Sequence, residues 1–188
     1  MYKLLGNKQL VTSLLYRGSE HGWKYGDFHS RCDKNGANIC LFKVKDGDCI
    51  GGFTKSNWSS PWPHYRYVGK TDAMLFNLSC CRHFPSKETG TDIYCSYYWG
   101  PCFRGGNHSE LGALAPFNGF ESCVSNANKE GYEIPVNEAG INMLTNQKDG
   151  AFTISELEVW EVKFLEWTRS FSSSQPLAIF VIYVYTYD

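Results

Sequence analysis

Hydrophobic and polar positions alternate most clearly between residues 38 and 54. In "NICLFKV", Ile39, Leu41 and Lys43 alternate with positions 40, 42 and 44. A period of two is typical of a strand with one buried face, so we expect a half-buried strand here. The following "DGD" is a strong hairpin signal, and "CIGGF" predicts the returning strand. The adjacent Gly51 and Gly52 predict either a bulge or a close approach of another segment to the backbone.

Three further strands are expected, in "AMLFNLS" (73–79), "DIYCSYYW" (92–99) and "FTISELEVWEVKFLEW" (152–167). In the last of these, Leu157 and Val159 share one face, with glutamates opposite. The phase then changes, and Trp160, Val162 and Phe164 take the apolar positions. We therefore predict a bulge or a bend near Val159–Trp160.

Helical signals are few. In "WKYGDFHSRC" (23–32), Tyr25, Phe28 and Cys32 are spaced i, i+3, i+7, which predicts a short amphipathic helix that ends before Gly36. "EAGINMLTNQ" (138–147) is interpreted as one helical turn within a stretch, 104–150, that has little periodicity.

Strands thus dominate, and no alternation of strands with helices is evident. We predict a mainly β fold with short helices (α+β), a two-sheet antiparallel β-sandwich flanked by helices. Residues 1–168 are expected to form a single domain. Residues 169–188 are expected to be a polar linker, "SFSSSQP", followed by an aromatic and aliphatic tail.

The amino-acid composition argues against several classes of function. The 188 residues carry 18 basic and 19 acidic side chains, a net charge of −1, so neither a nucleic-acid footprint nor a polybasic membrane segment is visible. The longest apolar run, 176–187, is shorter than the roughly 20 residues of a spanning helix. The N-terminus has no signal-peptide pattern, which favours an intracellular protein that is not secreted, cytoplasmic or on the surface of an organelle or large assembly. Aromatic residues reach 16%, as in aromatic-rich β cores and interfaces.

The stretch "YYWGPCFRGGNHSEL" (97–111) resembles a functional loop. A phosphate-binding loop needs a lysine and a hydroxyl residue after its second glycine, but Asn107 and His108 follow Gly106. The dinucleotide fingerprint needs a third glycine that is missing. We therefore expect no cofactor, and interpret the stretch as a turn in which glycines allow positive φ.

No catalytic or metal site is predicted either. His108, Ser109 and Glu110 are neighbours in sequence, which rarely form a triad. Cys80, Cys81 and His83, with cysteines 95 and 102 further along, match no zinc-finger spacing. Alternating glutamates near the C-terminal strand are interpreted as its solvated face. A thiol-based antioxidant activity needs an exposed cysteine of low pKa, and the hairpin Cys49 and the loop Cys102 are the candidates for exposure.

Several blocks together resemble the TLDc domain family. They are "LLYRGSEHGWKYGDFHSRCD" (14–33), "IGGFT" (50–54), "DAMLFNLS" (72–79), "WGPCFRGG" (99–106) and "FTISELEVWEV" (152–162), in the family's order. The resemblance implies a two-sheet β-sandwich of a eukaryotic protein linked to oxidative-stress resistance. It also implies binding to the vacuolar-type proton ATPase, and it brings no established active site. One departure is that Glu110–Leu111 stands where the family has an Asp-Leu pair.

Two sets of candidate residues follow from these patterns. The candidate protein-interaction residues are Trp99, Phe103, Arg104, Glu110, Phe180, Tyr183 and Tyr185. The candidate fold-defining residues, which match the family pattern, are Arg17, Ser19, Gly51, Gly52, Gly100, Pro101 and Glu158.

The favoured hypothesis is a non-catalytic binding or accessory module that docks on a large assembly, with the proton ATPase as the partner that the resemblance implies. A structural subunit of another multiprotein machine is the first alternative. A cysteine-based antioxidant enzyme is the second.

Overall fold

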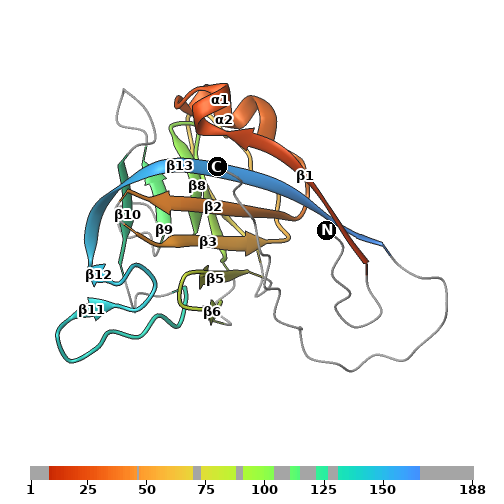
Figure 1. The fold of residues 1–188 in the computed structure, drawn as a ribbon. Coiled ribbons are helices and arrows are strands. Elements are labelled where there is room, and N and C mark those ends of the chain that lie inside the picture. The colour runs from red at the N-terminus through yellow and green to blue at the C-terminus, as the bar shows by residue number, and fades with distance from the viewer. Residues whose placement is uncertain are drawn as a thin grey trace.

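The computed structural model describes residues 9–45, 47–69, 73–87, 91–103, 111–114, 122–126 and 131–165. They form a mainly β fold with antiparallel pairing, as predicted (Figure 1). The two helices are α1 (Gly18–His21) and α2 (Tyr25–Cys32). The strands are β1 (Gln9–Arg17), β2 (Asn38–Val44), β3 (Cys49–Thr54), β4 (Arg66–Val68), β5 (Met74–Asn77), β6 (Arg82–Pro85), β7 (Ile93–Cys95), β8 (Trp99–Phe103), β9 (Leu111–Leu114), β10 (Ser122–Ser125), β11 (Ile141–Asn142), β12 (Gln147–Lys148) and β13 (Gly150–Leu165).

One long strand joins the two layers of the fold. The main sheet has the order β6-β5-β3-β2-β13-β10-β9-β8, and β1 also pairs with β13. The first residues of β13, 150–153, pair with β10, whereas its later residues pair with β2 and β1. Because β13 belongs to both halves, the sheet folds back on itself, and the β8-β9-β10 layer lies behind the β2-β3 layer in Figure 1. Two small sheets, β4-β7 and β11-β12, complete the described strands.

The core between the layers is aromatic. Phe103 of β8 is fully buried, and its ring meets the buried Trp58 ring edge to face, with 5.7 Å between centroids. Trp58 in turn meets Phe28 of α2 at 6.0 Å. A Cβ on Gly52 would lie 2.3 Å from the Phe103 ring, so the core needs glycine at this point of β3. Pairing with β2 is continuous through Gly51 and Gly52, so the pair marks a close approach and not a bulge.

A second apolar cluster lies on the opposite face of the β2-β3 layer. Its buried members are Ile39, Leu41, Phe53, Phe76 and Val162, and the partly buried Ala37, Cys49, Met74, Leu78, Trp160 and Phe164 pack against it. β2 is therefore buried on both faces over most of its length, and not half-buried as its alternation suggested.

The second apolar cluster also explains the phase change in β13. Leu157 and Val159 face the core between the layers, and Val162 lies in the second apolar cluster. Between Leu157 and Phe164 the alternation does not break, because these two parts of the strand are apolar on opposite faces. The register irregularity opposite Val159–Trp160 belongs to β1, where the extra residue is Leu15. The bulge of β13 itself falls at Ser155.

The structure corrects two other sequence interpretations. Residues 99–103 form strand β8 and not a turn; Pro101 fits because the pairing with β9 is irregular between Trp99 and Cys102, and proline is tolerated at bulges. The turn expected in 138–147 is not helical, because β11 and β12 pair there as a small hairpin. α2 forms as predicted, whereas the short α1, β6, β9 and β10 were not anticipated.

Candidate functional site

The structure does not place the predicted interaction residues together on one surface. Phe103 is fully buried in the core, so its ring is not available at the surface. Trp99 is half-buried at the start of β8 and contacts the Tyr94 ring, with 5.6 Å between centroids. The other five, Arg104, Glu110, Phe180, Tyr183 and Tyr185, lie outside the described residues, as does the predicted tail 169–188.

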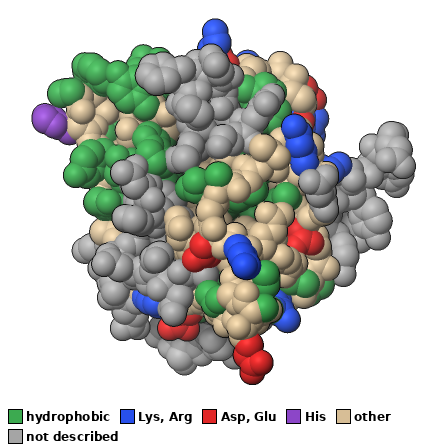
Figure 2. Space-filling model, turned by 90° about the vertical axis from the view of Figure 1, so that its left-hand side faces the viewer, with side chains coloured by type: hydrophobic (Ala, Val, Ile, Leu, Met, Phe, Trp, Pro, Cys, Tyr) green, Lys and Arg blue, Asp and Glu red, His purple; other side chains and the backbone are tan. Residues whose placement is uncertain are grey.

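A different set of aromatic residues is gathered on the surface. Among the described residues, most large hydrophobic side chains that are exposed lie in residues 62–67 and 97–98, and Figure 2 shows hydrophobic side chains collected on one side of the molecule. Trp62 is 64% exposed and Tyr65 61%, values far above those of core aromatic residues. We call Tyr25, Trp62, Tyr65, Tyr67, Tyr97 and Tyr98 the aromatic surface. Because apolar side chains are normally exposed singly, such a group indicates a binding surface.

The rings of the aromatic surface support one another. Trp62 meets Tyr97 and Tyr98 at 5.6 and 5.3 Å between centroids, and both tyrosines also contact Tyr25 of α2. These edge-to-face and tilted pairs are favourable geometries for aromatic rings. These ring contacts therefore restrict the side-chain conformations before a partner binds. Such preorganisation lowers the entropy cost of binding.

Polar contacts of α2 fix the segments that carry these rings. The His29 ring lies with Nδ1 2.8 Å from Asp33 Oδ1 and Nε2 3.1 Å from the Ser96 carbonyl oxygen, next to the Tyr97–Tyr98 turn. Ser60 donates to the other Asp33 oxygen at 2.7 Å, just before the Trp62 loop. One helix end thus holds both loops of the aromatic surface in place.

A buried hydrogen bond anchors the Trp62 loop from below. The Trp58 indole N–H donates to Asn38 Oδ1 at 2.7 Å, and both residues are almost fully buried. The Trp62 loop therefore begins next to a residue, Trp58, that is fixed in the core.

The aromatic surface includes one exposed basic side chain between two of its rings. Arg66, the basic residue of β4, donates to the Ser59 hydroxyl from Nε and Nη2 at 3.2 and 2.8 Å. The neighbouring Tyr97 raises the pKa of Tyr25 above the ordinary value, at which a phenol is already neutral at physiological pH. A surface of neutral rings with hydroxyl and indole groups is suited to protein recognition, in which tyrosine and tryptophan are enriched.

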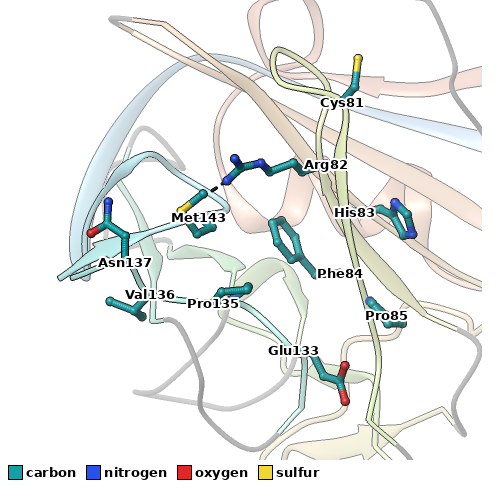
Figure 3. A pocket seen from close by; sticks show the side chains of 10 residues that line it. All are labelled: Cys81, Arg82, His83, Phe84, Pro85, Glu133, Pro135, Val136, Asn137 and Met143. Carbon is teal, nitrogen blue, oxygen red and sulfur yellow. Dashed lines mark hydrogen bonds between the residues drawn. The ribbon is translucent and has the colours of Figure 1, made fainter. Parts of the chain in front are cut away.

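A groove of about 630 Å³ lies elsewhere, between β6 and residues 133–143 (Figure 3). Arg82 reaches across it and donates to Met143 Sδ at 3.3 Å, while the Cys81 thiol contacts the Leu78 carbonyl oxygen. None of these contacts joins a nucleophile to a general base, so the groove shows no catalytic arrangement. Its lining residues are Cys81, Arg82, His83, Phe84, Pro85, Glu133, Pro135, Val136, Asn137 and Met143.

The cysteines are placed differently from the sequence prediction. Cys102 is fully buried and Cys49 is partly buried, whereas Cys80 and Cys81 are exposed. Burial raises the pKa of Cys49 to about 11, the opposite of what a reactive thiolate needs. In the part of the chain that the structure describes, no group of three His, Cys, Asp or Glu side chains is placed to hold a metal ion.

The glutamates of β13 attach α1 to the sheet. Glu158 accepts from Arg17 Nε at 2.8 Å and from the Trp160 indole, and only 12% of its side chain is exposed, so it is not a solvated glutamate. Glu156 accepts from the Ser19 backbone N–H at 3.1 Å and also from its hydroxyl. The remaining family-matching positions, Gly100 and Pro101, are buried in β8.

The sequence that forms these elements, from α1 and α2 to β13, matches a known family. The family model for the TLDc domain matches residues 2–163. The chain belongs to the TLDc domain family. A search of curated proteins found no match for the chain. Among the described residues of this TLDc domain, no helix is long and apolar enough to cross a membrane.

The sequence prediction missed the aromatic surface. A signal was present in "PWPHYRY" (61–67), where bulky aromatic residues alternate with proline and polar residues in a segment expected to be a loop. Strand alternation does not explain large rings in a loop, so this segment was a signal for exposed aromatic side chains.

Proposed function

We propose that this TLDc domain is a non-catalytic protein-binding module that docks on a large protein assembly through the aromatic surface. The observation that carries the proposal is the exposure of five large rings in two contacting groups, Trp62 with Tyr97 and Tyr98, and Tyr65 with Tyr67. Interfaces are anchored by such residues at their centres, surrounded by contacts that exclude water.

The partner proposed is the vacuolar-type proton ATPase, because this is the assembly that membership of the TLDc family implies. Protection against oxidative stress would then follow from binding and not from thiol chemistry. The raised pKa of Cys49 and the burial of Cys102 favour protein binding over thiol chemistry as the proposed function. The proposed location is inside the cell, on the surface of the assembly.

The test compares three forms of the full chain as bait in a mild cell extract, with the captured proteins identified by mass spectrometry. The first is the unchanged chain and the second carries Trp62→Ala and Tyr98→Ala. The control carries Val11→Ser and Val136→Ser, which remove apolar side chains that are 38% and 44% exposed away from the aromatic surface.

We expect the aromatic double variant to lose its partner, because two such anchors contribute about 2 kcal/mol or more, roughly a 30-fold loss of affinity. The valine control should retain it. Equal capture by all three forms would contradict the proposal. Capture of another assembly, lost in the aromatic variant alone, would leave the binding module in place and remove the proton ATPase as partner.

A further inference from the structure

The second apolar cluster is an unusual feature for the outer face of a sheet. Antiparallel sheets commonly pack one face on the core and expose a polar face to water. Here the outer face carries Ile39, Leu41, Phe53, Phe76 and Val162, each only 4–8% exposed. Side chains on one face shield one another laterally, but exposure this low calls for a cover above the layer.

The described residues supply no such cover. Every member of the second apolar cluster belongs to β2, β3, β5, β13 or the residues next to them, which form one layer of the sheet. The helix α2 packs elsewhere, since its buried residues, Phe28 and Cys32, face the core between the layers.

The chain itself continues from the rim of this cluster. β13 ends at Leu165, and Trp160, Val162 and Phe164 near its end are members of the second apolar cluster. Beyond it come residues 166–176, which are mostly polar but include Trp167 and Phe171, and then "LAIFVIYVYTY" (177–187), which has no charged side chain. The family match ends at residue 163, so this segment is a feature of the chain beyond the TLDc domain match.

We propose that residues 177–187 fold back across the second apolar cluster of the same chain and cover it. Residues 166–176 can span up to roughly 36 Å when extended. The distance across the face, from β13 over β2 and β3 to β5, is three strand spacings, or about 14 Å. In an extended conformation, residues 177–187 would have apolar side chains on both faces, so either face could contact the second apolar cluster.

This inference does not rest on the proposed function. It assigns Phe180, Tyr183 and Tyr185 to contacts within the chain, whereas the sequence alone suggested that they meet a partner. The aromatic surface then remains as the partner surface.

The direct test replaces Phe180 with the photo-cross-linker p-benzoylphenylalanine in the purified full chain, with no partner present. Irradiation followed by peptide mapping should give cross-links from position 180 to residues 39–41, 53, 74–78 or 160–164 within one chain. A mixture of isotopically light and heavy protein identifies links between chains. Links only between chains, or none to these residues, would overturn the proposal.

A second measurement uses charge substitutions in the full chain. One variant carries Phe180→Asp and Ile182→Asp, and another carries Ile179→Asp and Val181→Asp, so that both faces of the segment are sampled. We expect at least one pair to lower the Tm by about 5 °C and to increase binding of an apolar dye. A control with Ser172→Asp and Ser174→Asp in the linker should change neither value. If both pairs behave as the control does, the segment does not cover the cluster.

Discussion

Substitution of Gly52 by alanine tests the packing of the two layers. A Cβ at this position would lie 2.3 Å from Phe103 Cζ and 2.6 Å from two further ring atoms. The ring is fully buried between Trp58 and Tyr132, with centroid distances of 5.7 and 6.4 Å. β3 is itself paired on both sides, with β2 and β5, so neither partner can move freely.

The expected cost follows from this geometry. To restore an ordinary contact the ring and the strand must separate by roughly 1 Å, and overpacking of this kind typically costs 1–3 kcal/mol. Alanine recovers about 0.5–1 kcal/mol because glycine loses more backbone entropy on folding. We therefore expect a net loss of about 1 kcal/mol in the free energy of unfolding. For a domain of this size the Tm should fall by roughly 2–4 °C.

The assay is thermal and urea unfolding of the full chain, with two comparisons. Gly26→Ala is the matched control, because nothing lies within 4 Å of a Cβ there and α2 tolerates alanine, so stability should be unchanged or slightly higher. Phe103→Leu combined with Gly52→Ala should cost less than the sum of the two single changes, because the smaller side chain relieves the contact. A Gly52→Ala protein as stable as the unchanged one would refute the reasoning.

Two other outcomes are expected. Asn38→Ala should lower the free energy of unfolding by about 1–3 kcal/mol in urea titrations, because it leaves the buried Trp58 indole N–H without its acceptor; a loss below about 0.5 kcal/mol would show that the bond does not anchor the loop. In the native protein at pH 7.5, iodoacetamide should modify Cys80 and Cys81 first and Cys49 much more slowly, because burial holds the pKa of Cys49 at about 11 and keeps it a neutral thiol. Labelling of Cys49 should accelerate as pH rises toward that pKa, and peptide mapping that finds Cys49 modified first would contradict this order.

Local patterns were sufficient to predict part of the fold. The alternation in residues 38–54 predicts the β2-β3 hairpin, and the spacing of Tyr25, Phe28 and Cys32 predicts α2. Both are formed by neighbours in sequence, so a short window contains the whole signal. The glycine pair predicted either a bulge or a close approach; the structure shows the close approach, and the approaching ring, Phe103, is set by tertiary structure.

The errors arise where tertiary contacts override local signals. Gly100 and Pro101 favour a turn by composition, but a bulge against β9 accommodates them within β8. In β13, the apolar Trp160 and Val162 suggested a bulge, whereas they lie on a second buried face of the strand. Hydrophobicity alone does not distinguish these two cases. The aromatic surface was missed because exposure of Trp62 and Tyr98 depends on where the folded layers leave their loops.

The most direct test of the central claim is cross-linking mass spectrometry of the full chain purified with its partner under mild conditions. Lys24 is exposed beside Tyr25 of the aromatic surface, and Lys163 is exposed on β13. The account predicts cross-links from Lys24 to one partner assembly, few from Lys163, and loss of the Lys24 links in the variant with Trp62→Ala and Tyr98→Ala. Partner cross-links confined to Lys163, and unaffected by that variant, would contradict it.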